Sequence, residues 1–214
     1  MIKKGNRRLM TKILVYYAHP GEKYSRVNSK MAAVAKECSY VTYVDLYAEY
    51  PRFVIDVDKE QQRLLDHDII IFQHPVFWYS TPAIVKEWFD LVLEYGFAYG
   101  TGGDKLKGKY MMNAVTAAGS KDAYSESGFQ NFRLRTFFTP LEQTARLCQM
   151  SYLAPFVLYS SLAADEDKEI KEHIIAYKEL LQLLHNGAFD LKKAVSLETI
   201  ERHEIESLKI GKGC

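Results

Sequence analysis

The chain has 214 residues, with a formal net charge of +1 at pH 7 and a sequence pI of about 7.7. This near balance of charge argues against nucleic acid as a partner, and no apolar run approaches the roughly 20 residues of a membrane-spanning helix. The length suits one α/β domain with an extension, and it is sufficient to bury a sizeable core.

The amino-terminal residues 1–10 are basic, and no apolar stretch follows them. We interpret this segment as a short basic arm rather than a signal peptide. The cysteines Cys38, Cys148 and Cys214 are odd in number and widely spaced, which indicates a reducing, cytoplasmic location rather than a disulfide framework. The histidines show no metal-ligand spacing, so we expect no metal site.

Apolar and amphipathic stretches alternate along residues 11–187 and predict strands and helices in turn. The expected strands are 12–17, 40–45, 68–73, 110–116 and 153–159, and the expected helices are 25–38, 59–66, 83–95, one within 140–148, and 165–185. Such alternation predicts a parallel sheet with right-handed crossovers. We therefore expect an α/β three-layer sandwich with a five-stranded parallel sheet in the flavodoxin-like order 2-1-3-4-5.

The loop after the third expected strand is the most informative segment. Pro75 and Pro82 bracket it, and three aromatic residues, 77–79, lie between them. The prolines restrict the conformations of the loop before any ligand binds, and we expect the backbone N–H groups of 76–79 to face the polar edge of a ring system. Because open α/β sheets bind ligands at the carboxyl ends of their strands, the loop predicts a site for a planar redox cofactor. The alternative is an ordinary connection whose aromatic side chains belong to the core.

Two further loops are expected at the same edge of the sheet. The first strand leads through His19 to Ser25, which we predict to cap the next helix, and Arg26 follows. A helix amino terminus with unpaired N–H groups and a nearby cation favours a phosphate, and an ordinary structural cap is the alternative. The fourth strand ends in small residues, 116–119, which let the backbone approach a ligand closely unless they serve only tight helix–sheet packing.

Two segments stand outside this core pattern. Residues 96–109 are rich in glycine, with Phe97 and Tyr99 interleaved, and they predict a long functional loop. Residues 188–214 form a charged extension of helical character. The sequence leaves open whether this extension wraps a neighbouring subunit or is only partly ordered.

Several of these motifs occur in the same order in a known family. They are His19-Pro20, Ser25 with Asn28, the run from His74 to Pro82, Phe97-Ala98-Tyr99-Gly100, and the strand-end Thr116. Together they resemble the flavodoxin-like NAD(P)H:quinone reductases of the DT-diaphorase type, and most closely the short bacterial members of the KefF and KefG kind. The resemblance covers residues 11–187.

The resemblance implies a homodimer that binds FMN, or alternatively FAD, and passes two electrons from NADPH or NADH to a quinone-like small molecule. It implies that His19 and residues 25–28 hold the phosphate region, that 75–78 contact the isoalloxazine, and that 116–119 contact its pyrimidine side. It also implies a phenolic proton donor at Tyr124. The implied cofactor residues are His19, Ser25, Arg26, Val27, Asn28, Pro75, Val76, Phe77, Trp78, Thr116, Ala117, Ala118 and Gly119.

One departure from the family pattern concerns Ala117 and Ala118, because the family commonly has two glycines after its threonine pair. Alanine disfavours positive φ and adds methyl groups against a bound ring. We therefore expect altered flavin affinity or altered access for the substrate.

The predicted function is a flavin-dependent NAD(P)H oxidoreductase that reduces quinones or related electrophiles. The alternative is a regulatory ancillary subunit of a glutathione-gated potassium efflux system, bound to a membrane potassium efflux protein at the inner face of the membrane. A flavodoxin-like electron carrier is a third option, which the aromatic loops disfavour because a carrier exposes its flavin edge. The sequence distinguishes neither FMN from FAD nor NADH from NADPH, and it does not identify the natural acceptor.

Overall fold

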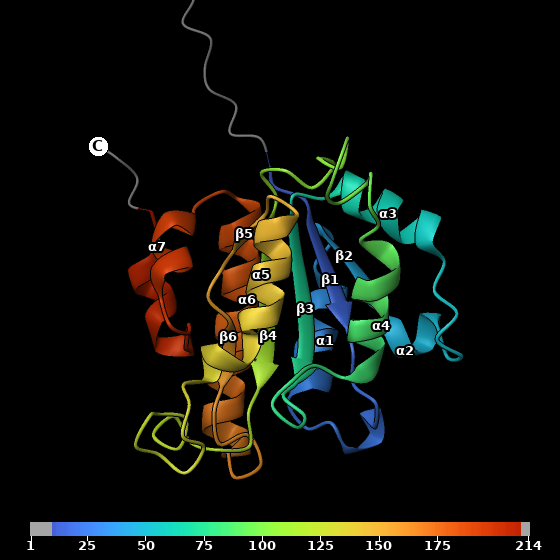
Figure 1. Ribbon diagram of the computed structural model, residues 1–214. Helices are drawn as coiled ribbons and strands as arrows, with labels where there is room; N and C mark the ends of the chain where they lie inside the picture. The colour runs from blue at the N-terminus through green and yellow to red at the C-terminus, as the bar shows by residue number, and fades with distance from the viewer. Residues whose placement is uncertain (1–9, 211–214) are drawn as a thin grey trace, which may run out of the picture.

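The computed structural model describes residues 10–210, and Figure 1 shows a central sheet with helices on both faces. The basic arm predicted at 1–10 lies outside the described residues except for Met10, and Cys214 lies outside them as well. Within the described part, no helix combines the length and the apolar character needed to cross a membrane.

The sheet is parallel, with the strand order β2-β1-β3-β4-β5, and β6 also pairs with β4. The strands are β1 (Ile13–Tyr17), β2 (Val41–Asp45), β3 (Ile69–Pro75), β4 (Tyr110–Thr116), β5 (Ser151–Tyr152) and β6 (Phe156–Leu158). The predicted order 2-1-3-4-5 is confirmed. Because the strands are parallel, the ends of β1, β3, β4 and β6 share one side of the sheet, which we call the carboxyl edge.

The last strand position is divided between β5 and β6, where the sequence predicted one continuous strand at 153–159. Pro155 has no N–H to donate to a ladder, and the N–H of Ala154 donates away from the sheet, to the carbonyl of Ala194 at 3.0 Å. β5 pairs with the start of β4 and β6 with its end. The strand is therefore interrupted next to the proline.

Helices cover both faces of the sheet, which confirms the predicted three-layer sandwich. One face carries α1 (Asn28–Glu37) and α6 (Lys171–His185), and the other carries α2 (Leu46–Glu49), α3 (Val57–Asp66), α4 (Ala83–Val92) and α5 (Thr139–Leu147). Within β1, Ile13 and Val15 pack towards α1 and α6, whereas Leu14 and Tyr16 pack towards the opposite helices. Burial on both faces explains why the strand sequence is apolar throughout rather than alternating.

Short helical turns complete the chain between the main elements. The predicted helix at 165–185 is confirmed, although its first turn, η3 (Glu166–Ile170), is π-helical. The 3₁₀ turns η1 (Glu22–Tyr24) and η2 (Leu134–Phe138) were not predicted from the sequence. Both of these turns lie in connections at the carboxyl edge.

A buried carboxylate joins the sheet to the helices on one face. Glu60 is fully buried in α3 and accepts hydrogen bonds from the hydroxyl of Tyr16, from the hydroxyl of Tyr50 at 2.5 Å, and from Nε1 of Trp88 at 3.1 Å. Arg63 forms an ion pair with the same carboxylate. Burial, together with this neighbouring carboxylate, raises the pKa of Tyr16 well above its usual value. A buried charge is tolerated here because every side of it is hydrogen-bonded or paired.

Residues 188–210, which we call the C-terminal extension, fold back onto α6 and onto β6. The extension contains α7 (Leu191–Ser196) and η4 (Arg202–Leu208), drawn in red in Figure 1, and η4 contacts both α6 and β6. Phe189, Ile200 and Leu208 are buried in the core that α1 and α6 share. The described part of the extension is thus ordered and packs on its own domain.

Candidate functional site

The loops predicted from the sequence meet at the carboxyl edge and enclose a cavity of about 290 Å³. Every predicted cofactor residue lines this cavity except Trp78, Ala117 and Gly119. The volume is near the lower end of the range for ligand pockets, so the cavity can enclose one part of a cofactor-sized ligand. The remainder of such a ligand would lie over the rim of the cavity.

The aromatic loop ends in a tight hairpin rather than an open loop. Phe77 and Ser80 exchange both backbone hydrogen bonds, with N···O distances of 3.1 and 3.0 Å. Trp78 and Tyr79 occupy the two turn positions with φ of 47° and 64°, which is the geometry of a type I′ turn and normally requires glycine or asparagine. The Trp78 side chain is 93% exposed. A strained turn that carries an exposed indole is typical of a functional loop.

The expectation that the N–H groups of 76–79 are all available to a ligand is wrong for two of them. The N–H of Val76 donates to the carbonyl of Thr116 at 2.9 Å, and the N–H of Phe77 donates across the hairpin to Ser80. The first of these bonds ties the aromatic loop to the end of β4. The loops on which the site depends are therefore held in register by the backbone itself.

The first loop also lines the cavity, and its helix begins later than predicted. α1 starts at Asn28, not Ser25, but Oγ of Ser25 still accepts the N–H of Ser29 at 2.8 Å. The Arg26 guanidinium donates to the carbonyls of Leu162 and Ala164 and pairs with Glu166 at 3.1 Å. Arg26 thus ties the segment after β6 to the first loop, which differs from the free cation expected from the sequence.

A buried polar chain runs beneath the cavity floor. Nδ2 of Asn28 donates to Oγ1 of Thr116 at 2.8 Å, and Nε2 of Gln73 donates to the Asn28 carbonyl at 2.8 Å. The Tyr177 hydroxyl in turn donates to Oε1 of Gln73 at 3.1 Å. Oδ1 of Asn28 is buried and has no hydrogen-bond partner among the described residues. An orphaned acceptor beside a cavity indicates a ligand that donates a hydrogen bond there.

His74 supports the aromatic loop from below. It is fully buried, with Nδ1 at 3.0 Å from the Pro75 carbonyl and Nε2 at 2.8 Å from Nδ2 of Asn113. The Tyr152 hydroxyl donates to the other amide atom, Oδ1 of Asn113, at 2.8 Å. Burial lowers the pKa of His74 to about 4, against the opposing effect of the Pro75 carbonyl. A neutral imidazole therefore holds the loop at physiological pH.

The small residues at the end of β4 divide between the core and the cavity. Ala117 is buried and its N–H donates to the carbonyl of Leu158 at 2.9 Å, whereas Ala118 lines the cavity. None of residues 117–119 has a positive φ, so alanine introduces no backbone strain here and that part of the expectation is wrong. A methyl group on Gly119 would lie 3.0 Å from the Tyr124 ring, so the glycine lets Tyr124 pack against the strand end.

Tyr124 lies beside the cavity, in a neighbouring open groove of about 630 Å³. Its ring lies 6.1 Å from that of Phe137 and 6.0 Å from that of Tyr159. Burial raises the pKa of the half-buried phenol, with a further contribution from Tyr79. Ala118 lines the cavity and Tyr124 lines the groove, and Gly119, next to Ala118, lies against the Tyr124 ring. The predicted proton donor is therefore near the cavity without lining it.

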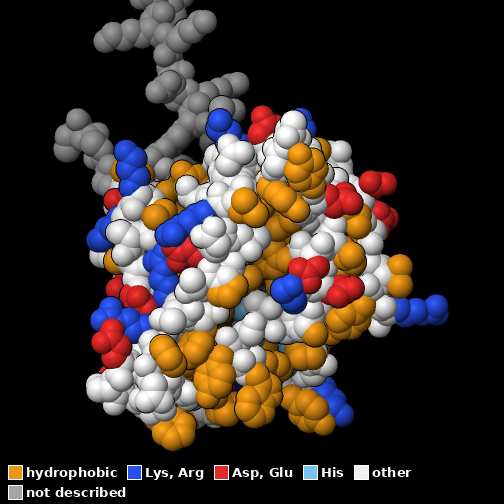
Figure 2. Space-filling view, viewed as in Figure 1, with side chains coloured by type: hydrophobic (Ala, Val, Ile, Leu, Met, Phe, Trp, Pro, Cys, Tyr) orange, Lys and Arg blue, Asp and Glu red, His pale blue; other side chains and the backbone are white. Residues whose placement is uncertain are grey.

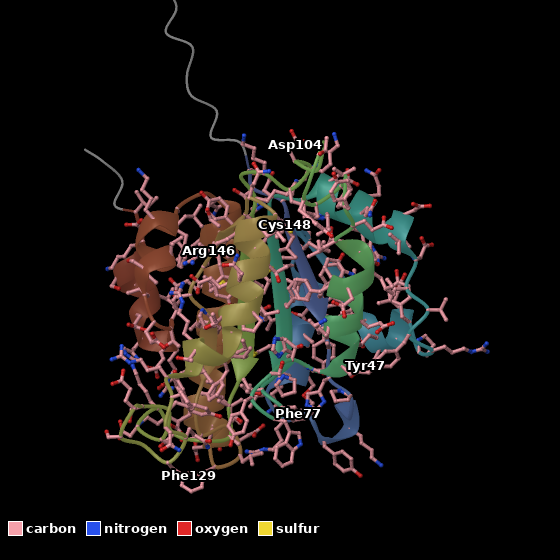
Figure 3. All side chains as sticks on the ribbon, in the orientation of Figure 1. Tyr47, Phe77, Asp104, Phe129, Arg146 and Cys148 are labelled. Atoms are coloured by element: carbon pink, nitrogen blue, oxygen red, sulfur yellow. The ribbon has the colours of Figure 1, made fainter. Side chains whose placement is uncertain are left out.

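The rim of the cavity is strongly apolar. Figure 2 shows apolar side chains gathered at the lower end of the view, and Figure 3 places Phe77 and Phe129 at that same end. The exposed apolar residues at this end include the hairpin side chains Phe77, Trp78 and Tyr79, and also Tyr24, Phe129, Phe132 and Leu162. Exposed apolar patches of this kind mark sites for ligands or partners.

Three cavity-lining residues were missed in the sequence: Tyr24, Ser161 and Leu162. Ser161 and Leu162 follow β6, and the strand order alone could have placed them, since β6 ends at the same edge. No motif singled them out. Conversely, the glycine-rich loop at 96–109 joins the end of α4 to the start of β4 and lies at the other end of the sheet, where Figure 3 labels Asp104. It does not line the cavity.

One group of side chains has the spacing of metal ligands within the described residues: Glu201, His203 and Glu204. The two carboxylates already form a capping box at the start of η4, and Glu201 also accepts from Nζ of Lys121 at 2.6 Å. These groups therefore have structural partners.

Comparisons with known proteins agree with the fold. A family model for the flavodoxin-like fold matches residues 11–181. A glutathione-regulated potassium-efflux system ancillary protein KefG from Erwinia tasmaniensis is 39% identical over 178 residues, which cover 82% of this chain and 96% of the relative.

Solved structures are also similar. The general stress protein 14 of Treponema denticola in complex with FMN superposes with a TM-score of 0.76 at 33% identity, covering 81% of this chain and 99% of that one. An NADPH-quinone reductase of P. pentosaceus gives a TM-score of 0.70 at 27% identity, covering 79% and 96%. A chain described as a thermophilic tryptophan halogenase gives a TM-score of 0.76 at 39% identity, covering 78% and 97%, so the names of the neighbours do not by themselves fix a reaction.

The matched residues contain the whole sheet and all the predicted cofactor residues. The match covers well over half of the chain, and the sheet order is the one that this fold requires. The chain therefore belongs to the family of proteins with the flavodoxin-like fold.

Proposed function

We propose that the protein is an FMN-dependent NAD(P)H oxidoreductase that reduces quinones or related electrophiles by two electrons. The observation that carries the proposal is the buried, partnerless Oδ1 of Asn28 beside a cavity with an aromatic rim. A flavin fits both features, because its sugar-alcohol chain offers hydroxyl donors and its ring system offers a flat apolar surface. The FMN complex of the T. denticola protein supports FMN over FAD.

A bound flavin would supply the redox chemistry, accepting a hydride from NAD(P)H and returning two electrons to the acceptor. The protein would bind and orient it. Oδ1 of Asn28 would accept a hydrogen bond from the sugar-alcohol chain. Ser25 would lie at the phosphate end, where the start of α1 offers N–H groups and the positive end of its dipole. Val76 and Phe77 would support the ring, since their backbone is fixed by the hairpin and by Thr116.

Tyr124 would give a proton to the reduced acceptor. Burial raises the pKa of this phenol above its usual value, so it is protonated at neutral pH, which is the state that a general acid requires. The apolar rim would exclude water from the reacting groups. We also propose a homodimer, because a second copy would cover the exposed aromatic side chains at 78 and 129.

The visible absorption spectrum tests the proposal most directly. Purified protein with added FMN should retain the flavin after gel filtration, bleach on anaerobic addition of NADPH or NADH, and recover on addition of a quinone. Repeating the titration with FAD identifies the preferred cofactor. Protein that binds neither flavin would refute the proposal.

A pair of variants connects the spectrum to the structure. Asn28→Ala should weaken FMN binding by about tenfold, as expected for loss of one buried hydrogen bond. Asn186→Ala is the matched control, because Asn186 ends α6 at the other end of the sheet from the cavity. Equal FMN affinity of the two variants would contradict the assignment of Asn28.

A second function is favoured by the relatives named KefG: an ancillary subunit of a potassium efflux system, with the flavin site serving regulation. Such a subunit would act in the cytoplasm, at the inner face of the membrane. Co-purification with a membrane protein from detergent extracts, lost when Trp78 is replaced by Ala, would support this role. Rapid quinone turnover by the isolated protein without such a partner would favour the enzyme.

A further inference from the structure

The C-terminal extension contacts the segments that surround Tyr124, although the family match ends before it, at residue 181. We propose that this extension positions Tyr124 and the aromatic side chains next to it, and so controls the reaction with the acceptor. The inference rests on the proposed oxidoreductase function. Three separate connections carry it.

The first connection is an ion pair to the loop that bears Tyr124. Nζ of Lys121 donates to Oε1 of Glu201 at 2.6 Å, and the Glu201 side chain is mostly buried. This carboxylate raises the pKa of Lys121. The Tyr124 N–H donates back to the Lys121 carbonyl at 3.1 Å. Lys121 and Tyr124 are therefore parts of one turn, and Glu201 anchors that turn.

The second connection acts through Arg135 in η2. The guanidinium donates to the carbonyl of Val195 at 3.0 Å and to that of Leu197, both in the extension. Two residues later, the ring of Phe137 lies 6.1 Å from Tyr124 and 4.9 Å from Tyr79. Arg135 thus connects the extension to the ring that packs near both the predicted proton donor and the aromatic hairpin.

The third connection is a strand-like pairing with β6. The N–H of Val157 donates to the carbonyl of Ile200 at 2.9 Å, and the N–H of Ile200 donates to that of Pro155 at 2.8 Å. β6 leads directly into Tyr159, whose ring lies 6.0 Å from Tyr124. The neighbouring Glu198 lines the same groove as Tyr124. The extension therefore contributes to the lining of that groove through Glu198.

Removal of the whole extension is a poor test, because Phe189, Ile200 and Leu208 contribute to the core and the truncated chain would lose stability. The informative variant is Glu201→Gln, which removes the charge that holds Lys121 but keeps an acceptor for the capping box. The matched control is Arg202→Gln, which breaks ion pairs of the same segment with Glu172 and Glu169 instead.

A double-mutant cycle with Tyr124→Phe tests the positioning role. In the holoprotein, Glu201→Gln should lower kcat/KM for a soluble benzoquinone by about threefold to tenfold, while the same change in the Tyr124→Phe background should have less than about a twofold effect. The FMN dissociation constant and the KM for the nicotinamide should stay within about twofold, since neither depends on Lys121. The control variant should retain the wild-type kcat/KM.

Equal losses in the two backgrounds, or an equal loss in the Arg202→Gln control, would overturn the proposal, because either result means a general effect on stability. Hydrogen exchange of residues 117–133 provides a readout that does not depend on turnover. Glu201→Gln should accelerate exchange in this segment and Arg202→Gln should not. If the wild-type protein reduces no quinone, the proposed function fails, and unchanged exchange in Glu201→Gln would separately refute the anchoring of the loop.

Discussion

The backbone conformation of the aromatic hairpin predicts that Trp78→Gly is more stable than Trp78→Ala, which is the reverse of the usual order. At an ordinary exposed position alanine is more stable than glycine, because glycine loses more backbone entropy on folding, about 0.5–1 kcal/mol. At φ of 47°, however, any residue with a Cβ is strained, at a cost of about 1–2 kcal/mol. Glycine relieves this strain and alanine does not.

The difference between these two effects gives the expected magnitude. Subtracting the entropic cost of glycine from the strain that it relieves leaves Trp78→Gly more stable than Trp78→Ala by about 0.75 kcal/mol, within a range of about 0–1.5 kcal/mol. Loss of the indole affects both variants equally, and it is a small loss because the side chain is 93% exposed. For a chain of this size the two melting temperatures should differ by about 1–4 °C.

Thermal and urea unfolding of the two variants check the order, with Glu87→Gly and Glu87→Ala as the control pair at an exposed position within α4. The control pair should show the ordinary order, alanine above glycine. If alanine is also the more stable residue at position 78, the strain argument is refuted. Both Trp78 variants should lose flavin retention or turnover, which would show that the strained conformation is kept for the site and not for stability.

Three further predictions concern buried groups and the cavity. His173 stacks on Phe156 with ring centroids 4.4 Å apart, and burial, with Arg202 nearby, lowers its pKa from 6.5 to about 3. Because the unfolded chain binds a proton on this imidazole more readily, the contribution of His173 to the free energy of unfolding should be fully present above pH 6.5 and fall by up to about 1.4 kcal/mol per pH unit below it. Urea unfolding at pH 7 and pH 4.5 should show a smaller decrease in this free energy for His173→Phe than for the wild type, and an identical decrease would contradict the assignment. Glu60→Ala should destabilise the protein by about 3–5 kcal/mol, since it leaves the buried hydroxyls of Tyr16 and Tyr50 and the indole N–H of Trp88 unpaired at about 1–3 kcal/mol each; a decrease below about 1 kcal/mol in urea unfolding would refute that role. Ser25→Ala combined with Arg26→Ala should weaken FMN binding by about tenfold, and an unchanged dissociation constant by fluorescence titration would remove the phosphate site from the first loop.

The fold was predictable because its signals are local and repeated. Each buried strand is an apolar run, and each helix has its own periodic pattern, so the alternation and the parallel sheet follow from the sequence. The division of the last strand was not predicted, although Pro155 was visible, because the partner of the freed N–H, the Ala194 carbonyl, belongs to the extension. Nothing local in the sequence indicates that pairing.

Most residues that line the cavity were predictable from the sequence, as the fold was, but the polar contacts of these residues were not. Parallel strands bring their ends to one edge, which is why loops distant in sequence could be assigned to one cavity. The use of Arg26 is different, because its partners Leu162, Ala164 and Glu166 follow a strand far along the chain. In the sequence, a cation beside a helix start predicts a phosphate ligand. Only the fold shows that Arg26 instead holds the segment after β6.

The cavity and its rim would have different roles, and only the role of the rim differs between the two proposed functions. Both functions require the enclosed polar end, where Asn28 and Ser25 would hold the same flavin. Only the rim differs, because an enzyme needs Trp78 and Phe129 to meet an acceptor or a second copy, whereas an ancillary subunit needs them to meet a membrane protein. Burying such large aromatic side chains contributes about 1.5–3 kcal/mol each, which is enough to change the affinity for a partner by tenfold or more. Substitutions in the rim that leave flavin content intact but abolish one of the two activities will therefore identify which surface the aromatic side chains serve.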